Sequence, residues 1–261
     1  TRLVQGPRDS WHDAILPAFF LLIAVFLWFF LSNAGRILLM IASFAVLGFV
    51  HNFQLSLVDA GLLVTGVLPS SLAKRIFLFA ALGGAFFLGP LWCSFLCPVG
   101  AAQEILHMLS RLVRGEKLLQ LARTGSMRPD PRSLPVLAAQ SVKYLLLGGS
   151  LAIFGWTLDQ RFLGWDPLSF LFALPPQSWI LYLAWAAGIG LPSLVLYRPW
   201  CRFACPFGAL LMLLGKFAFL GRFFPVRKLK DCDFGTKSVH DLHCIRCQRC
   251  CTRFLRKNPA D

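Results

Sequence analysis

Two pairs of cysteines lie in two copies of one ten-residue pattern, W-C-x-F-x-C-P-x-G-A. The first copy begins at Trp92 and the second at Trp200, 108 residues later. Seven of the ten positions are identical, and each copy follows a long apolar run. The repetition predicts two equivalent units that bring their cysteines to the same place.

Four thiolates in one place are a ligand set for a metal. The two copies supply Cys93, Cys97, Cys201 and Cys205. Four cysteines hold a cubane [4Fe-4S] cluster, and Cys-x3-Cys-Pro matches the end of the bacterial ferredoxin run. Zinc takes the same four ligands and is the main alternative, beside a site without metal. A disulfide framework is less consistent with such tight spacings.

A second set of cysteines lies near the C-terminus. It comprises Cys232, Cys244, Cys247, Cys250 and Cys251. Cys-x2-Cys-x2-Cys wraps three corners of a cubane in one loop, and a distant cysteine completes it. We expect Cys232 to be that fourth ligand, with Cys251 as an alternative to Cys250. In another arrangement the triplet recruits Cys97 or Cys205 from the first set.

A few other polar residues are candidates for the same chemistry. Arginines near the cysteines would offset the charge of a thiolate-ligated cluster, or contact anionic lipid: Arg202, Arg246, Arg249 and Arg253. Four further residues have a functional and a simpler interpretation. His51 is a haem ligand or a packing residue, Lys143 marks a quinone or proton site or extends to the surface, and His240 and His243 are possible ligands in the tail.

The segments that must position these cysteines are strongly apolar. Of the 261 residues, 57% are hydrophobic and 15% are charged, against about 25% charged in a typical soluble domain. Several runs approach the roughly 20 apolar residues that cross a hydrocarbon layer. We therefore expect an all-α polytopic membrane protein with about five transmembrane helices, at Ile15–Leu31, Ile37–Phe53, Ile76–Trp92, Val136–Trp156 and Trp179–Tyr197.

Two further elements are expected beside the spans. Residues Ala102–Val113 have apolar side chains at helical spacing and Gln103, Glu104 and His107 on the other face, which predicts an amphipathic helix on the surface. Phe207–Leu220 is expected to form a sixth, shallow element. A short, irregular, ferredoxin-like tail ends the chain.

The chain is thus expected to have three parts. Residues 1–13 form a lead-in, residues 14–220 a membrane domain, and residues 221–261 a cytoplasmic iron-sulfur tail. The two equivalent units occupy 76–115 and 179–220 of the membrane domain. The net charge of +14 comes from Lys and Arg gathered after each cysteine pair. By the positive-inside rule, both pairs and the C-terminus are expected on the cytoplasmic side of a bacterial inner membrane, with no nucleic acid as partner.

At these motifs the chain resembles the NosR/NapH family of membrane-bound, polyferredoxin-like iron-sulfur proteins. The match is residue by residue at the two Cys-x3-Cys-Pro motifs, at Cys93, Cys97 and Pro98 and at Cys201, Cys205 and Pro206. The resemblance implies electron transfer that links a quinol pool or a cytoplasmic donor to a respiratory enzyme. Family members usually end in two full ferredoxin runs, whereas this tail has one irregular set.

Taken together, these features predict a redox subunit of a membrane complex rather than a stand-alone enzyme. Electrons would pass one at a time through two [4Fe-4S] clusters, with a quinone as a further cofactor and other subunits as partners. No catalytic nucleophile or acid-base group is predicted outside the cysteines. The alternative is a structural or assembly subunit whose cysteines hold zinc or deliver metal to a partner.

Overall fold

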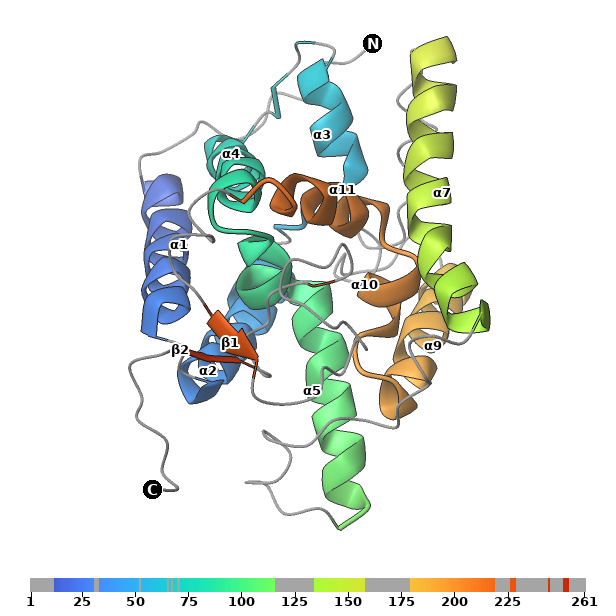
Figure 1. The fold of residues 1–261 in the computed structure, drawn as a ribbon. Helices are drawn as coiled ribbons and strands as arrows, with labels where there is room; N and C mark the ends of the chain where they lie inside the picture. Colours follow the sequence, from blue (N-terminus) through green and yellow to red (C-terminus); the bar gives the residue numbers. More distant parts are fainter. Residues whose placement is uncertain are drawn as a thin grey trace.

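The computed structural model describes residues 12–30, 33–51, 53–64, 66, 68–69, 71–115, 134–157, 179–218, 226–228, 244 and 251–253. Most of this part is helical (Figure 1). The first half contains α1 (His12–Phe30), α2 (Asn33–Ser43), the π-helix η1 (Phe44–Val50), α3 (Leu57–Val64), α4 (Leu72–Phe87), the π-helical turn η2 (Trp92–Leu96) and α5 (Pro98–Val113). The second half contains α7 (Leu134–Thr157), α9 (Trp179–Val195), α10 (Pro199–Phe203), α11 (Pro206–Gly215), β1 (Val226–Lys228) and β2 (Cys251–Arg253).

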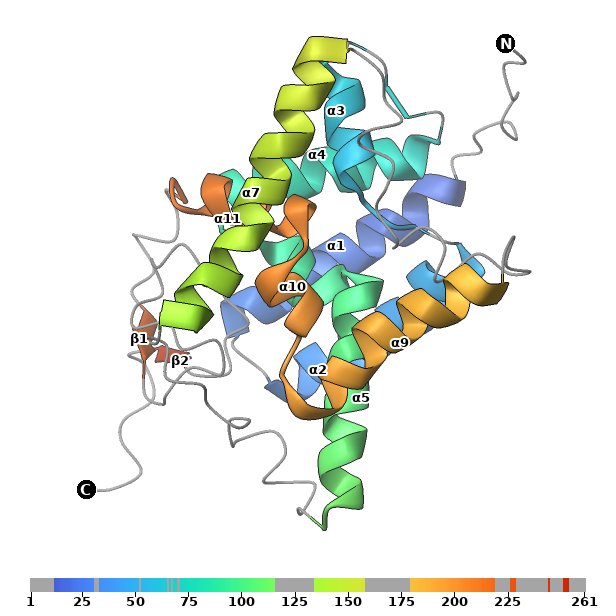
Figure 2. The same ribbon diagram turned by 90° about the vertical axis from the view of Figure 1, so that its right-hand side faces the viewer.

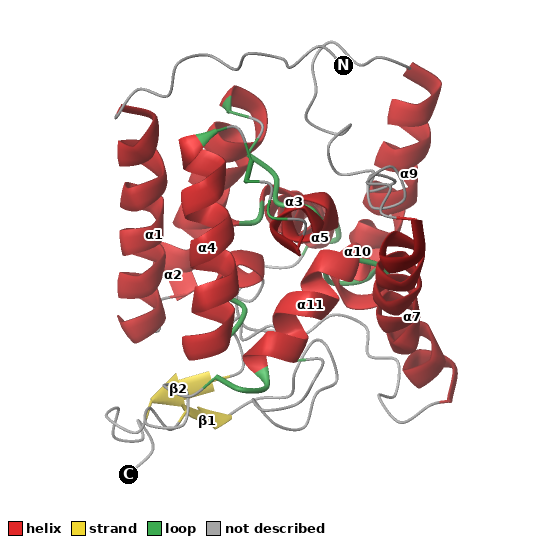
Figure 3. Cartoon of the chain, turned by 90° about the horizontal axis from the view of Figure 1, so that it is seen from above, coloured by secondary structure: helices red, strands yellow, loops and turns green. Residues whose placement is uncertain are grey.

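The helices of the two halves pack against one another around the cysteine motifs. Helix α1 lies beside α4, and α11 contacts both α4 and α7 (Figure 3). On the other side, α5 packs along α9, and the short helix α10 lies against α7 and α9 (Figure 2). Each repeat therefore lies next to helices from the other half of the chain.

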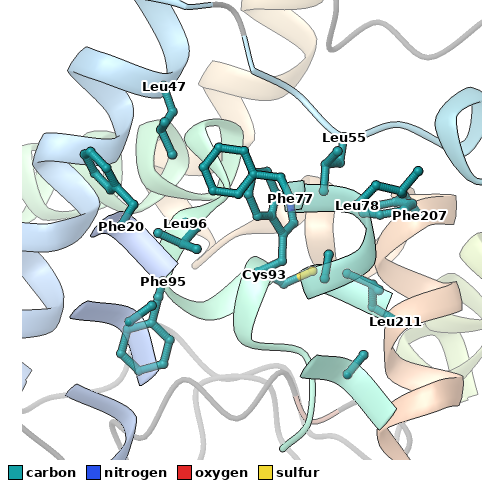
Figure 4. Packing of buried hydrophobic residues seen from close by; sticks show 14 of the residues in the cluster. Phe20, Leu47, Leu55, Phe77, Leu78, Cys93, Phe95, Leu96, Phe207 and Leu211 are labelled. Carbon is teal, nitrogen blue, oxygen red and sulfur yellow. The ribbon is translucent and has the colours of Figure 1, made fainter. Parts of the chain in front are cut away.

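An apolar cluster of aromatic and aliphatic side chains surrounds the first repeat. Phe77 of α4 is fully buried and meets the Trp92 ring edge to face, with 5.1 Å between ring centroids. Cys93, Phe207 and Leu211 belong to the same cluster, which joins α4 and η2 to α11 (Figure 4). This core shields Cys93 from water, and Cys97 packs against its edge.

The turn before the first repeat is set by glycine and proline. Helix α4 ends at Phe87, and Gly89 follows with a φ of 103°, in the left-handed region that side chains disfavour. Pro90 then prevents the helix from continuing. The Pro90 carbonyl accepts a hydrogen bond from the Ser94 hydroxyl at 3.0 Å, which ties the turn to η2.

The expectation of a polytopic membrane protein with about five transmembrane helices is wrong for the part of the chain that the structure describes. Helices lie in the five expected stretches, but none of those described combines the length and the apolar character needed to cross a bilayer. Helix α4 has 16 residues and α2 has 11, against the roughly 20 that a span needs. Helix α7 has 24 residues but carries Lys143 near its middle.

The expected orientation of the amphipathic helix is also wrong. Helix α5 covers the predicted stretch, but Gln103, Glu104 and His107 are buried, whereas Leu109 and Leu112 are exposed. The polar face is turned inward because Gln103 and Glu104 form hydrogen bonds with other buried groups there. Periodicity located the helix but did not determine which face is buried.

The sixth expected element corresponds to α11, which is shorter than Phe207–Leu220 and largely buried. In the tail, β1 and β2 form an antiparallel pair in which Lys228 lies opposite Cys251. Of the lead-in at 1–13, only the first two residues of α1 are described. The cysteines Cys232, Cys247 and Cys250, with His240 and His243, lie outside the described residues.

Candidate metal centre

The two Cys-Pro steps have the same backbone conformation. Cys97 precedes α5 with φ −65° and ψ 115°, and Cys205 precedes α11 with φ −71° and ψ 109°. In both units the proline is the first helical residue, where its missing N–H costs nothing and its φ suits the helix. The repeat in sequence is therefore a repeat in structure at the second cysteine of each pair.

The loop between the two cysteines of each pair is closed by the same hydrogen bond. The Cys97 amide donates to the Trp92 carbonyl at 2.8 Å, and the Cys205 amide donates to the Trp200 carbonyl at 2.9 Å. The first loop is a π-helical turn, and the second is the short helix α10 followed by Ala204. In both loops the tryptophan carbonyl therefore lies next to the amide of the second cysteine.

Backbone amides point at the sulfurs that begin the helices. The Gly208 amide donates to the Cys205 sulfur at 3.2 Å. At the equivalent place in the first unit, burial raises the pKa of Cys97, and backbone hydrogen bonds from Gly100 and Val99 partly oppose that rise. A helix N-terminus with amides directed at sulfur favours the thiolate over the thiol. Both second cysteines thus have the surroundings of a metal-binding thiolate.

The thiols of the two units lie close enough for their charges to interact. Burial raises the pKa of Cys93 well above its usual value, and the charges of Cys97 and Cys201 raise it further. Burial, followed by the charge of Cys201, raises the pKa of Cys97 to about 12. Burial is also the main reason that the pKa of Cys201 is raised. Without a bound metal, these three cysteines are therefore neutral thiols at neutral pH.

Among the described residues, no group of three or more His, Cys, Asp and Glu side chains could hold one metal ion. In a cubane each thiolate binds a different iron, so the four sulfurs surround the cluster instead of meeting at one atom. The burial, the shared electrostatics and the amides at Cys97 and Cys205 fit a four-cysteine cluster site.

One side chain links the two units directly. Gln103 of α5 accepts a hydrogen bond from the Trp200 amide at 2.9 Å, and its own amide nitrogen lies 3.5 Å from the Cys201 sulfur. The same nitrogen donates to the Val99 carbonyl at 3.3 Å. Gln103 is fully buried, so these contacts satisfy a polar group that would otherwise oppose folding. The first unit thereby fixes the backbone at the start of the second pair.

A buried carboxylate organises the arginines beside Cys93. Glu104 binds Arg36 of α2 in a two-pronged ion pair and accepts from Arg198, whose Nη2 lies 2.7 Å from the carboxylate. The Tyr197 hydroxyl donates to the same carboxylate at 2.6 Å. Arg198 in turn donates to the Cys93 carbonyl from a left-handed backbone conformation with φ 48°. The network joins α2, α5 and the turn before α10 at the site.

A buried lysine approaches the site from α7. Lys143 is fully buried, and its Nζ lies 3.1 Å from the Met212 sulfur of α11. Burial lowers the pKa of Lys143 to about 8, whereas the charges of Cys205, Cys201 and Cys93 raise it. Arg202 is buried in α10 near the same lysine, and its charge lowers that pKa. The lysine does not extend to the surface.

The other predicted site residues are less informative. His51 is exposed and stacks on Phe53 with 5.3 Å between ring centroids, which fits a packing role. Cys244 is partly buried, and the backbone of Cys251 lies in β2. Arg246 and Arg249, like most of the tail cysteines, fall outside the described residues, and only the backbone of Arg253 is described.

The sequence analysis missed Arg198 and the roles of Gln103 and Glu104. The sequence does contain one sign of these roles, because the two units differ at the positions of Gln103 and Glu104. The second unit has Leu211 and Met212 where the first has Gln103 and Glu104. A polar pair in one copy and an apolar pair in the other indicates that only the first copy makes a buried polar contact there.

Comparison with known proteins agrees with this site. Residues 72–115 and 178–230 match the model of a family described as a 4Fe-4S binding domain. The chain carries a 4Fe-4S binding domain. The matched segments run from α4 through η2 to α5, and from just before α9 through α10 and α11 to β1, so they contain both Cys-Pro steps. The finding supports an iron-sulfur cluster, without giving the number of clusters.

A protein of Escherichia coli strain K12, YccM, which is named as an electron transport protein, is 28% identical over 207 residues. The match covers 76% of the present chain and 51% of that protein, so the chain spans about half the length of this curated relative. No solved structure matches the chain. The resemblance to the NosR/NapH type stays a prediction.

Proposed function

We propose that the chain is an iron-sulfur electron-transport protein in which Cys93, Cys97, Cys201 and Cys205 hold one [4Fe-4S] cluster. The observation that carries this proposal is the equivalent geometry of the two Cys-Pro steps inside the matched domain. The relative named as an electron transport protein supports the same function. A cubane exchanges one electron at a time and needs no bond chemistry from the protein.

The residues of the chain hold the cluster and determine its environment. The amides near Cys97 and Cys205 stabilise the thiolates, and the apolar cluster around Phe77 and Trp92 keeps water away. Hydrogen bonds to sulfur, burial and nearby charge are the protein's means of setting a reduction potential. Arg198, held beside the Cys93 carbonyl, contributes positive charge at the site.

The finer assignment concerns the electron donor, the electron acceptor and the tail. We infer a relay between a quinone pool or a cytoplasmic donor and a respiratory partner enzyme, because a bound cluster alone has no substrate. Cys232, Cys244, Cys247 and Cys250, with Cys251 as an alternative, form the ligand set of a second [4Fe-4S] cluster in this proposal. Other subunits of a redox complex would be its partners. The location at a bacterial inner membrane stays a prediction.

The test is low-temperature electron paramagnetic resonance on protein purified without oxygen and reduced with dithionite. Iron, zinc and acid-labile sulfide are counted on the same sample. The expected result is a reducible cubane signal, with about eight irons if both cysteine sets are filled and about four if one is. Replacing Cys97 and Cys205 together by serine then removes the signal of the cluster that these residues hold.

A result of zinc without a reducible signal would overturn the electron-transport proposal in favour of the structural alternative. The Cys244→Ser variant is the matched control, because Cys244 belongs to the other cysteine set. We expect this variant to keep the signal of the cluster held by the two Cys-x3-Cys-Pro motifs. Loss of every signal from this single tail substitution would contradict the assignment of ligands.

A further inference from the structure

The feature that the proposed function leaves unexplained is the buried ammonium of Lys143. Its exposed fraction is 0%, and it lies near the middle of α7, far from either end of the helix. Removing a charge from water is unfavourable unless another group compensates it. An apolar residue of similar size would avoid this cost, so the ammonium of Lys143 requires a compensating charge.

No described carboxylate lies within ion-pairing distance of Lys143. Its contacts are the Met212 sulfur, 3.1 Å from Nζ, and the ring of Tyr144, whose centroid is 5.1 Å away. Neither group carries a charge. Arg36 and Arg198 differ in this respect, because both bind the carboxylate of Glu104.

The negative charges that can balance Lys143 are those of the cysteines. Met212 is in α11, the helix that begins directly after Cys205. Helix α7 also packs on α10, which contains Cys201 (Figure 2). The charges of Cys205, Cys201 and Cys93 each raise the pKa of Lys143 against the effect of burial. When the four cysteines are thiolates that hold a cluster, three of them therefore act on this one ammonium.

We propose that Lys143 is the buried counter-charge of the four-cysteine site and favours the reduced state of the cluster held there. This inference rests on the proposed function. The cluster takes one electron from an external reductant, and Lys143 keeps its proton and forms no bond. Because reduction adds one negative charge to the site, a fixed positive charge nearby raises the reduction potential.

The experiment compares the midpoint potentials of loaded wild-type protein and the Lys143→Met variant, in a redox titration followed by electron paramagnetic resonance. Methionine retains most of the length and the apolar part of the side chain but removes the ammonium that contacts Met212. We expect a more negative midpoint potential, with at least a tenfold change in the ratio of reduced to oxidised cluster at a fixed potential. Tenfold corresponds to about 59 mV for one electron.

Two further variants separate charge from packing. Lys143→Arg retains the charge and should have a potential close to wild type. Lys216→Met removes an exposed lysine just after α11 and should leave the potential unchanged, because solvent screens its charge. A second measurement uses the metal-free protein, in which Lys143→Met should be at least as stable to urea as wild type, since the uncompensated ammonium is gone.

Each result decides the question. A wild-type potential in Lys143→Met with normal iron content would overturn the proposal. If Lys143→Met takes up no iron while Lys143→Arg does, the positive charge is needed at the site and the proposal stands. If neither variant takes up iron although both fold, Lys143 has a packing role instead. Absence of iron from the wild-type protein would refute the proposed function and not this inference alone.

Discussion

The buried carboxylate of Glu104 is the shared partner of the polar side chains beside Cys93. Its partners, Arg36 and Arg198, come from elements far apart in the sequence. Removing one member of such a buried network leaves the other charges buried without a partner. The free-energy cost of those unpaired charges exceeds the stabilisation that the intact ion pairs supplied. The carboxylate therefore determines whether the two guanidinium groups can remain inside.

Substitution of Glu104 by glutamine tests this role. We expect a loss of about 3 to 5 kcal/mol in the free energy of unfolding of the metal-free protein, measured by urea denaturation. The matched control is Lys74→Gln, which breaks a partly exposed ion pair with Asp59 at 3.1 Å and should cost below about 1 kcal/mol. Equal losses in the two variants would show that Glu104 is not the organising group.

The thiols of the site determine a pH dependence of the metal-free protein. Burial raises the pKa values of Cys93, Cys97 and Cys201 in the folded state. Above about pH 9 the unfolded chain loses these thiol protons while the folded protein keeps them, so stability falls as the pH rises. Lys143, with its pKa lowered to about 8, contributes in the opposite direction between about pH 8 and 10.5.

Three thiols outweigh one ammonium, so the urea midpoint should fall between pH 9 and 10.5. The slope amounts to about 1.4 kcal/mol per pH unit for each proton by which the two states differ. The Cys201→Ala variant, which has one shifted thiol fewer, should show a smaller fall. A midpoint that rises across this range would contradict the assignment of neutral thiols.

At the scale of elements, the sequence predicted the repeat well. Seven shared positions placed a proline at the start of α5 and of α11, and both Cys-Pro steps adopt one backbone conformation. This succeeded because proline and helix N-termini restrict the backbone locally. The orientation of α5 was not predictable in the same way. Which face is buried depends on Trp200 and Arg198, which lie about 100 residues further along the chain.

The contact between α5 and α10 gives a prediction for Gln103. Replacing Gln103 by leucine, the residue at the equivalent position 211, removes the acceptor of the Trp200 amide. We expect a loss of about 1 to 3 kcal/mol in unfolding free energy, because a buried donor loses its acceptor. Circular dichroism during urea denaturation measures this loss. Unchanged stability would mean that the two units pack together without the Gln103 bridge.

The whole molecule differs most from what composition indicated. A hydrophobic content of 57% predicted membrane spans, yet no described helix meets the requirements of a span. Composition counts residues without their positions, whereas a span needs about 20 apolar residues in one uninterrupted helix. Lys143 interrupts the apolar segment of α7. The role of buried polar side chains such as Arg36 and Glu104 in the interior is visible only once the helices are assembled.

The two Cys-Pro steps come from distant parts of the chain, and this separation has a consequence for chain entropy. Cys97 and Cys201 are separated by about 100 residues, so any group bonded to both closes a covalent ring of that size. Closing such a ring restricts the unfolded ensemble by about 4.7 kcal/mol in a simple chain-entropy model. The assembled centre would then act as a cross-link between the two halves of the protein. Release of the metal would remove this link, so that the two halves could separate.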